Sequence, residues 1–427
     1  MAKLIEMEGR KVTLQVTIEL SDSLLETESR IQDGCNEVGT LATEEALKLL
    51  DTDGSPFKMG EIKWTSKGQE EQKYQTPYGE VRIARHLYQT SKGGATYCPL
   101  EDKARIIRKA TPRFAMQLSH KYTQENVQAV CRDLEENHNR KVSRSFVQNT
   151  VKWVGSIASA KEEEWEYDLP PIDEPVSSIV LSLDGAHILM REVGWREAMV
   201  GAISLYNLDG ERIHSIYLGS APEYGKTDFK KRLEKEIEKI KQIYPKAIYL
   251  GIADGAKDNW SFLGKHTDRQ LLDFYHVTEY LGKVAYAAYP QKTGKPKRKE
   301  WLSKRCKQLK HDTGTVEALI TEMEMFSRKK RLAKTIKEDL NRALTYFKNH
   351  RTMMDYPQHI QDNLPIGSGV TEAACKTMVK QRLCCSGMRW KKQGAGMILA
   401  LRGLVQSGTR WTQFWSKINQ YGTVIST

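Results

Sequence analysis

The feature that most restricts the fold of this chain is a series of short apolar runs between residues 178 and 274. The pattern predicts strands at 178–183, 198–206 and 212–218, with a hairpin turn at 207–210. A helix with one apolar face follows, and two further strands enclose a second, shorter helix. The apolar face comprises Phe229, Leu233, Ile237, Ile240 and Ile243, and the last two strands are 247–253 and 270–274. These elements predict an α/β domain whose mixed sheet is flanked by helices.

Three acidic residues occupy informative positions in this pattern. Asp184 and Asp254 each follow an apolar strand and each precede a glycine. Glu372 lies one turn into a helix that begins behind Ser368, so its side chain points back toward the helix N-terminus. The order of strands and helices resembles that of a ribonuclease H-like core, which implies that the first and fourth strands are neighbours. Asp184 and Asp254 should then converge, and Glu372 should complete the cluster.

A cluster of buried carboxylates predicts a bound cation. Carboxylates repel one another when they are buried, and a divalent cation is the usual compensation. Ligands that are all oxygen suit Mg²⁺ or Mn²⁺ rather than zinc. Two such ions, about 3.5–4 Å apart, would hold the attacking and leaving oxygens of an in-line phosphodiester displacement. We therefore expect Asp184, Asp254 and Glu372 to be both the catalytic residues and the metal ligands.

Each of these acids also has a purely structural interpretation. Asp-Gly is a hairpin-turn signal, and Asp209 has that role. For Asp184 a turn and a metal ligand are both open, and its place in the strand order favours the ligand. Asp254 follows an unbroken strand-like run, which also favours a ligand. Glu372 alone would fit a first-turn carboxylate that the helix dipole stabilises.

Residues 219–227 form a competing motif, because they are glycine-containing and lie between a strand and a helix. Asp254 would then be the acid of a P-loop nucleotide hydrolase. The spacing argues against this, since five residues rather than four separate the glycines. Pro222 also removes an amide donor, and Glu223 would face the phosphates with a like charge.

The rest of the chain divides by composition. A strand at 11–19, a helix at 24–50 and a strand at 81–87 predict a small N-terminal α+β module. Helices follow, with Thr123 and Ser143 as N-caps, and they fit a helix-turn-helix DNA-binding domain or a plain helical hairpin equally well. The predicted domains are the α+β module at 1–111, the helical module at 112–160, a proline-containing linker at 161–176, the first part of the core at 177–276, a basic α-helical insertion at 277–364, and the second part of the core, with the Glu372 helix and the closing helices, at 365–427.

Composition narrows the class of protein. Hydrophobic residues make up 39% and charged residues 28%, a balance that excludes a disordered chain. Lys and Arg outnumber Asp and Glu by 66 to 54, which favours a polyanionic partner such as nucleic acid. No apolar run reaches membrane-spanning length, and the first residues lack a signal-peptide core, so we expect an intracellular protein without a membrane partner. Seven cysteines without a C-x-x-C pair predict neither a disulfide framework nor a zinc site, and Cys384 and Cys385 are expected to be buried thiols.

Five segments resemble bacterial insertion-sequence transposases of the DDE type, in the broad Mutator-like group with a helical insertion. They are SLDGAHIL at Asp184, APEYGKTDF at 221–229, YLGIADGAKDNW at Asp254, DFYHVTEYL at 273–281, and IGSGVTEAACKTMVKQRLCCSGMRW at 366–390. The resemblance covers residues 175–427 and extends more loosely to the N-terminal modules. It implies that Asp184, Asp254 and Glu372 hold two Mg²⁺ or Mn²⁺ ions.

The resemblance also implies a function and further contacts. The enzyme would cut double-stranded DNA at the element's ends and join the freed 3′-hydroxyl to target DNA, as a dimer or higher oligomer at the bacterial nucleoid in the cytoplasm. Asp273-x-x-His276 would lie near the site, although a strand-end structural histidine is an equal alternative. Lys376, Arg389 and Trp390 are candidate active-site or DNA contacts. A helix-end cation and a core tryptophan are the equal alternatives for Arg389 and Trp390.

Two other functions stay open on the same residues. The first is a domesticated DNA-binding protein that keeps the fold without cutting, and the presence of all three acids argues against it. The second is a ribonuclease H-like structure-specific nuclease, whose chemistry needs similar acids.

Overall fold

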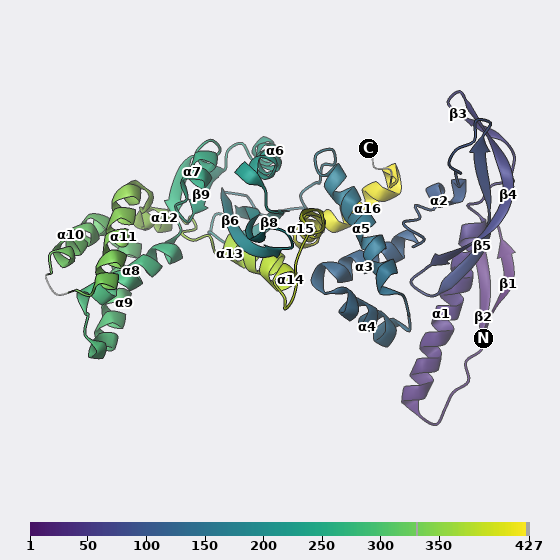
Figure 1. Cartoon of the computed structure of the whole chain (residues 1–427), viewed down its shortest axis with the longest axis horizontal. Coiled ribbons are helices and arrows are strands. Elements are labelled where there is room, and N and C mark those ends of the chain that lie inside the picture. Colours follow the sequence, from purple (N-terminus) through teal and green to yellow (C-terminus); the bar gives the residue numbers. More distant parts are fainter. Residues whose placement is uncertain (330–331, 424–427) are drawn as a thin grey trace. The chain divides into compact units, whose positions relative to one another are not determined.

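The computed structural model describes residues 1–329 and 332–423, which form two compact units. The first unit comprises residues Met1–Tyr167 together with the chain from Thr409 onward, and the second comprises Asp168–Gly408 (Figure 1). The division at Tyr167 falls inside the expected linker, where residues 165–177 form no helix or strand. No helix in the described part of the chain combines the length and apolar character that crossing a bilayer requires.

The first unit contains two small antiparallel sheets and a set of helices. Helix α1 confirms the expected helix at 24–50, while three strands were not predicted. Much of β4 is polar and exposed, so the alternation that signals a half-buried strand is weak there. The elements are β1 (Ala2–Glu8), β2 (Lys11–Val16), α1 (Leu24–Lys48), β3 (Phe57–Met59), β4 (Ile62–Gln75), β5 (Glu80–Thr90), α2 (Pro99–Lys103), α3 (Pro112–Gln124), α4 (Val127–His138), α5 (Arg144–Lys161) and α16 (Arg410–Tyr421).

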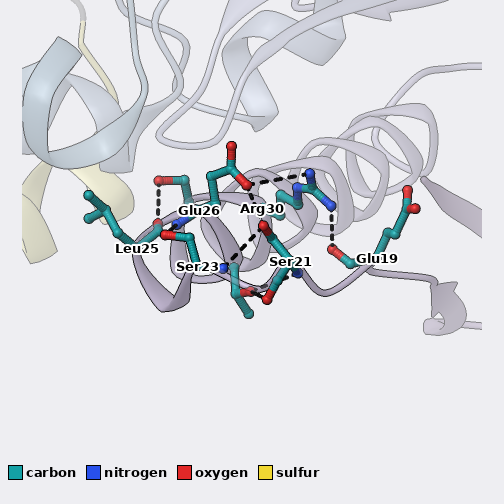
Figure 2. Close-up of polar contacts among 8 residues, drawn as sticks. Glu19, Ser21, Ser23, Leu25, Glu26 and Arg30 are labelled. Atoms are coloured by element: carbon teal, nitrogen blue, oxygen red, sulfur yellow. Dashed lines mark hydrogen bonds and ion pairs between the residues drawn. The ribbon is translucent and has the colours of Figure 1, made fainter.

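A local polar network starts helix α1 (Figure 2). The Ser23 side chain accepts a hydrogen bond from the Glu26 N–H at 3.4 Å, which satisfies a free amide of the first turn. Arg30 ties the preceding segment to the helix, because its guanidinium donates to the Glu19 carbonyl at 3.0 Å and pairs with Glu26 at 3.8 Å. The N-terminus of this helix is thus determined by residues close in sequence.

The helical module contains one confirmed cap and one wrong cap. Ser143 caps α5 by accepting from the Phe146 N–H at 3.2 Å, as expected. The expected cap at Thr123 is wrong, because Asn126 caps α4 and accepts from the N–H groups of Gln128 and Ala129. Thr123 lies inside α3, where its hydroxyl donates to the His120 carbonyl instead. The closing helix α16 belongs to this unit, so the expectation that it joins residues 365–408 in the core is wrong. Apolar periodicity predicts a helix but not the unit on which it packs.

A five-stranded mixed sheet is the centre of the second unit. Its strand order is β10-β9-β6-β7-β8, with β6, β7 and β8 antiparallel and with β9 and β10 parallel to β6. Helices flank this sheet, and Phe229, Leu233 and Ile237 of α6 are buried in its core. The elements are β6 (Ser178–Met190), β7 (Gly194–Tyr206), β8 (Arg212–Ser220), η1 (Tyr224–Lys226), α6 (Thr227–Ile243), β9 (Ile248–Ala253), α7 (Lys257–Leu263) and β10 (Arg269–Leu272).

The remaining segments of this unit are helical. Between residues 274 and 361 the described chain contains helices without a strand, as expected for the insertion. The chain then returns to the sheet through a helix that begins at Gly369 and contains a π-helical turn. The elements are α8 (Phe274–Ala288), η2 (Lys292–Gly294), α9 (Lys295–His311), α10 (Thr315–Ser327), α11 (Lys334–His350), η3 (Arg351–Met353), α12 (Tyr356–Gln361), α13 (Gly369–Ala374), η4 (Cys375–Lys380), α14 (Gln381–Leu383) and α15 (Lys392–Gln406).

Candidate active site

Asp184 lies on the central strand β6, and Asp254 directly follows β9, the parallel strand beside it. The β6–β9 pairing matches Leu181 with Gly251, and Asp184 and Asp254 each lie three residues beyond that pair. Asp254 directly follows β9, as expected. The expectation that Asp184 ends its strand is wrong, because β6 continues to Met190 and Asp184 pairs with Val200 of β7. The pattern was misread because Gly185 and His187 interrupt the apolar run.

The electrostatics of Asp184 reflect this position. Burial raises the pKa of the Asp184 carboxyl, and the negative charge of Asp254 raises that pKa further. Hydrogen bonds from the Gly185 N–H, at 2.7 Å, and from the Cys375 thiol oppose these effects. Asp184 is therefore influenced by the charge of Asp254 and contacts the helical segment that follows Glu372.

Glu372 reaches the same region from α13. The Thr371 and Ser182 hydroxyls form a buried hydrogen bond, which ties α13 to β6 two residues before Asp184. Burial raises the pKa of Glu372, and so do the charges of Asp273 and Asp184. The residue itself remains exposed, so the carboxyl has access to solvent. The three expected acids are therefore brought to one part of the sheet.

Asp273 fixes the start of the Glu372 helix. Its side chain is 1% exposed, and one carboxylate oxygen accepts from the His276 N–H at 3.0 Å, which caps α8. The other oxygen accepts hydrogen bonds from the N–H and the hydroxyl of Ser368, the residue before α13. A backbone hydrogen bond from Phe274 to Ile366 at 3.0 Å joins the same two segments. Asp273 is thus a positioning residue for Glu372.

His276 lies in the first turn of α8 rather than at the end of a strand, so that alternative is wrong. The strand β10 stops at Leu272 because Asp273 caps a helix there. The imidazole is half-buried, lies 3.8 Å from the Glu279 carboxylate, and packs edge-to-face on the ring of Tyr280. His276 also lowers the pKa of Glu372, so it is part of the same electrostatic cluster.

The insertion contributes a tyrosine that sequence patterns do not reveal. The Tyr346 hydroxyl of α11 donates to the Asp254 carbonyl at 2.9 Å, and its ring stacks on Tyr280 with centroids 4.1 Å apart. Gly255 has a φ of +101°, and a Cβ there would lie 3.0 Å from the Tyr346 ring. The glycine after Asp254 therefore permits a left-handed turn and the close approach of this ring. Its signal was the Asp-Gly pair, which indicates a turn but not a partner.

A π-helical turn follows Glu372 and carries Cys375 to Asp184. Such turns leave main-chain carbonyls without their usual partners, and here buried Arg402 of α15 supplies them. Its guanidinium donates to the carbonyl of Met378 at 2.9 Å and to that of Thr377. Burial, aided by the charge of Arg382, lowers the pKa of Arg402 to about 10. Arg402 therefore supports the segment that presents Cys375.

We expect Arg402→Met to lower the free energy of unfolding by about 2–3 kcal/mol, because a buried and a part-buried carbonyl lose their donor while the aliphatic part of the side chain is kept. Any activity that depends on Glu372 should fall as well, since the turn behind Glu372 is no longer held. Thermal melting and activity assays measure the two effects. Lys380→Met, on an exposed residue of the same π turn, is the matched control and should change neither. An Arg402→Met protein that melts like the wild type would contradict this role.

Three further residues have defined positions. Lys376 is exposed on the π turn, and Arg389 is exposed with its carbonyl 3.5 Å from the Arg191 Nε. Trp390 is half-buried, and its main chain pairs with the end of β6 through hydrogen bonds to Leu189 and Arg191, each 2.9 Å long. Arg389 lies between α14 and α15 rather than at a helix end, and Trp390 is not a fully buried core residue.

Two sequence expectations near the site have clear outcomes. Cys384 and Cys385 are exposed, so the expectation of buried thiols is wrong; the helix ends at Leu383 and they lie in the following turn. The segment 219–227 does not form an open phosphate loop. Its Glu223 carboxylate accepts from the Asp228 N–H at 2.7 Å and thereby occupies the N-terminus of α6.

The raised pKa values predict how stability depends on pH. Asp184 and Glu372 have ordinary pKa values of 3.8 and 4.5, and the fold raises both. The folded state then keeps protons that the unfolded state has released, so stability falls as pH rises from these ordinary values through the folded-state values. Metal-free Asp184→Asn should therefore gain in melting temperature relative to wild type between pH 4 and pH 7. A difference in melting temperature that is constant across this range would contradict the burial of the Asp184 charge.

The donor chemistry of the site suits a hard cation. The acids supply oxygen ligands, and the raised pKa values reflect a negative charge that a cation would neutralise. Within the described residues, no three acidic, histidine or cysteine side chains form a metal shell, so the three carboxylates would have to move closer together to hold one ion.

Comparisons with known proteins found no match for this chain: no protein-family model matches the sequence, and no curated protein is significantly similar to it. The second unit has a five-stranded mixed sheet with Asp184 on β6, Asp254 directly after the adjacent strand β9, and Glu372 on a helix tied to β6.

Proposed function

We propose that this protein is a DNA transposase of the DDE type, which cuts DNA at the ends of its element and joins the 3′-hydroxyl to target DNA. The observation that carries the proposal is the grouping of the three acids. Asp184 lies on β6, Asp254 directly follows the neighbouring parallel strand β9, and Glu372 lies on a helix that the Ser182–Thr371 hydrogen bond ties to β6, although Asp254 and Glu372 are 70 and 188 positions from Asp184. A structural role does not require three acids to share one region of the sheet, since their repulsion costs free energy.

The sheet supports a ribonuclease H-like core. Three antiparallel strands followed by two parallel ones, with the first strand in the middle, correspond to the expected order. In this arrangement β6 carries the first acid, the second directly follows β9, and α13 carries the third after the helical insertion. The tie between Ser182 and Thr371 and the Asp273–Ser368 contacts explain how that return is held in place.

The acids are the residues that would hold Mg²⁺ or Mn²⁺, with two ions as the expected number. Such ions would activate the attacking water or hydroxyl and stabilise the charge of the phosphodiester displacement. The chain's own residues supply the rest of the site. Cys375 donates to Asp184 and fixes its carboxylate, while Tyr346 holds the turn at Asp254. His276 places an imidazole beside Glu372.

DNA would be held by cationic surfaces outside the acids. Residues 291–310 contain nine Lys or Arg and a single Glu, and in α9 only Trp301 and Leu309 are buried. Most of these cations therefore face solvent, where they can neutralise phosphates. The three helices α3, α4 and α5 are the candidates for recognition of the element's ends. Bringing two ends together requires at least a dimer on DNA.

The proposal is tested by strand cutting on end-labelled duplexes that carry the gene's own flanking sequences. Cutting should occur at the element boundary, should need Mg²⁺ or Mn²⁺, and should leave a 3′-hydroxyl. Duplexes with shuffled ends are the control. The proposal fails if the protein binds the true ends but cuts neither strand with either metal ion.

A further inference from the structure

A cavity of about 530 Å³ adjoins the candidate active site within the second unit. Its wall consists of the distal ends of β6 and β7, the segment before α6, and residues 390–392. Glu197 lies between the cavity and the acids. It lines the cavity and packs over Gly185, the residue next to Asp184. A Cβ on Gly185 would lie 2.2 Å from the Glu197 carboxylate. A DNA strand bound at the three acids would therefore have this cavity beside it.

The cavity favours an anionic ligand. Five cationic residues and three glutamates line it. Two of the glutamates are engaged: Glu197 pairs with Lys226 at 2.8 Å, and Glu223 caps α6. The other four cations make no ion pair within the described part of the chain; they are Arg191, Arg196, Lys391 and Lys392. These four are exposed and available for phosphates.

An immobilised aromatic ring stands at the same wall. The Trp390 indole N–H donates to the Leu383 carbonyl at 2.8 Å, and the Trp390 main chain is bonded to β6 on both sides. One hydrogen bond therefore holds the ring and two hold its main chain, so little conformational entropy is lost when a planar group stacks on the ring. A second aromatic, Tyr224, also lines the cavity and is fully exposed.

Stacking rings combined with unpaired cations are typical of sites for unpaired nucleotides. A bare phosphate fits less well, because the three glutamates would repel it and the nearby helix N-terminus is already capped by Glu223. The volume lies within the range of cavities that hold small ligands, roughly 300–1,000 Å³. A single nucleotide could stack its base on the ring and place its phosphates against the cations.

We propose that this cavity holds one unpaired nucleotide of the DNA strand next to the bond that is cut, with its base on Trp390 and its phosphates on Lys391, Lys392 and Arg191. This inference rests on the proposed transposase function for the identity of the strand. It assigns Trp390 to substrate binding and distinguishes the cavity from the cationic surface of the insertion.

The test uses the full-length protein and single-stranded hexanucleotides that contain one 2-aminopurine. Stacking on Trp390 should quench the 2-aminopurine fluorescence on binding. Trp390→Ala should abolish the quenching and weaken binding about tenfold, whereas Trp390→Phe should keep much of both. Trp195→Ala is the matched control, because Trp195 is 58% exposed on β7 and lies outside the cavity. Asp254→Asn should quench like the wild type.

Because Trp390→Ala also removes a hydrogen bond, a second variant tests the cavity without changing Trp390. Lys391→Gln combined with Lys392→Gln should reduce the slope of log affinity against log salt by about 1.4, since each phosphate contact on a single strand contributes about 0.7. Equal quenching by the wild type and folded Trp390→Ala, or an unchanged salt slope, overturns the inference. Metal-dependent cutting without quenching overturns the inference and leaves the proposed function standing. Quenching without any cutting supports the cavity assignment and counts against the proposed function.

Discussion

Asp184→Asn should reduce strand cutting by at least about 1,000-fold while DNA binding is retained. The replaced carboxylate is a proposed metal ligand, and a loss of that size corresponds to about 4 kcal/mol of transition-state stabilisation. The amide keeps the shape of the side chain, so the effect should fall on the rate rather than on DNA affinity. Single-turnover cutting and electrophoretic mobility shifts measure the two quantities. Asp254→Asn and Glu372→Gln should behave in the same way.

The chain offers a matched control for this substitution. Asp209 is also followed by glycine in the same unit, but it is exposed in the turn between β7 and β8. Asp209→Asn should cut like the wild type. Asp184→Asn should also melt no lower than the wild type at pH 7 without metal, because it removes a charge that burial and Asp254 disfavour. Cutting by Asp184→Asn within tenfold of the wild-type rate would remove this residue from the site.

Asp273→Ala should have a large effect on both stability and activity. The substitution leaves the N–H groups of His276 and Ser368 and the Ser368 hydroxyl without their acceptor. We expect the free energy of unfolding to fall by about 3–5 kcal/mol, since hydrogen bonds to a buried charged group are worth about 1.5–3 kcal/mol each and do not add fully. Cutting at a temperature where the variant is folded should fall about 100-fold, because Glu372 is no longer positioned.

A second aspartate that caps a helix, Asp355, serves to distinguish the loss of a helix cap from the loss of Glu372 positioning. Asp355 caps α12 by accepting from the Gln358 N–H at 3.4 Å, and it is exposed. Asp355→Ala should cost only about 1 kcal/mol of stability and leave cutting unchanged. The decisive measurement is the Mg²⁺ dependence of cutting. Asp273→Ala should need a higher Mg²⁺ concentration, which a general loss of stability does not produce; an unchanged requirement would make Asp273 purely structural.

The sequence predicts the elements of the sheet better than the contacts that hold the site. The apolar run before Asp254 ends where β9 ends, because a strand buried on both faces has an unmistakable composition. β6 is harder, since its second half alternates between buried and exposed residues beyond Asp184. β4 was not predicted, because its polar residues largely face solvent and carry no periodic signal.

The contacts around the acids depend on residues far apart in the chain. Asp273 meets Ser368 across 95 positions, and Tyr346 meets Asp254 across 92. No local pattern encodes such pairs, because propensity and periodicity describe neighbours along one helix or strand. Glu372 could be singled out by its place one turn into a helix, but that place also fits a first-turn carboxylate that the helix dipole stabilises. Its link to β6 through Thr371 and Ser182 emerged from the packing.

The most direct test of the central claim is strand joining rather than cutting. A labelled duplex that ends in the element's 3′-hydroxyl would be incubated with supercoiled plasmid, and covalent joint molecules would be counted by electrophoresis. A DDE transposase should form joint molecules with Mg²⁺ or Mn²⁺ and none with EDTA, and Asp254→Asn should form none. Metal-dependent hydrolysis of the same DNA without any joint molecules would contradict it and would identify a nuclease.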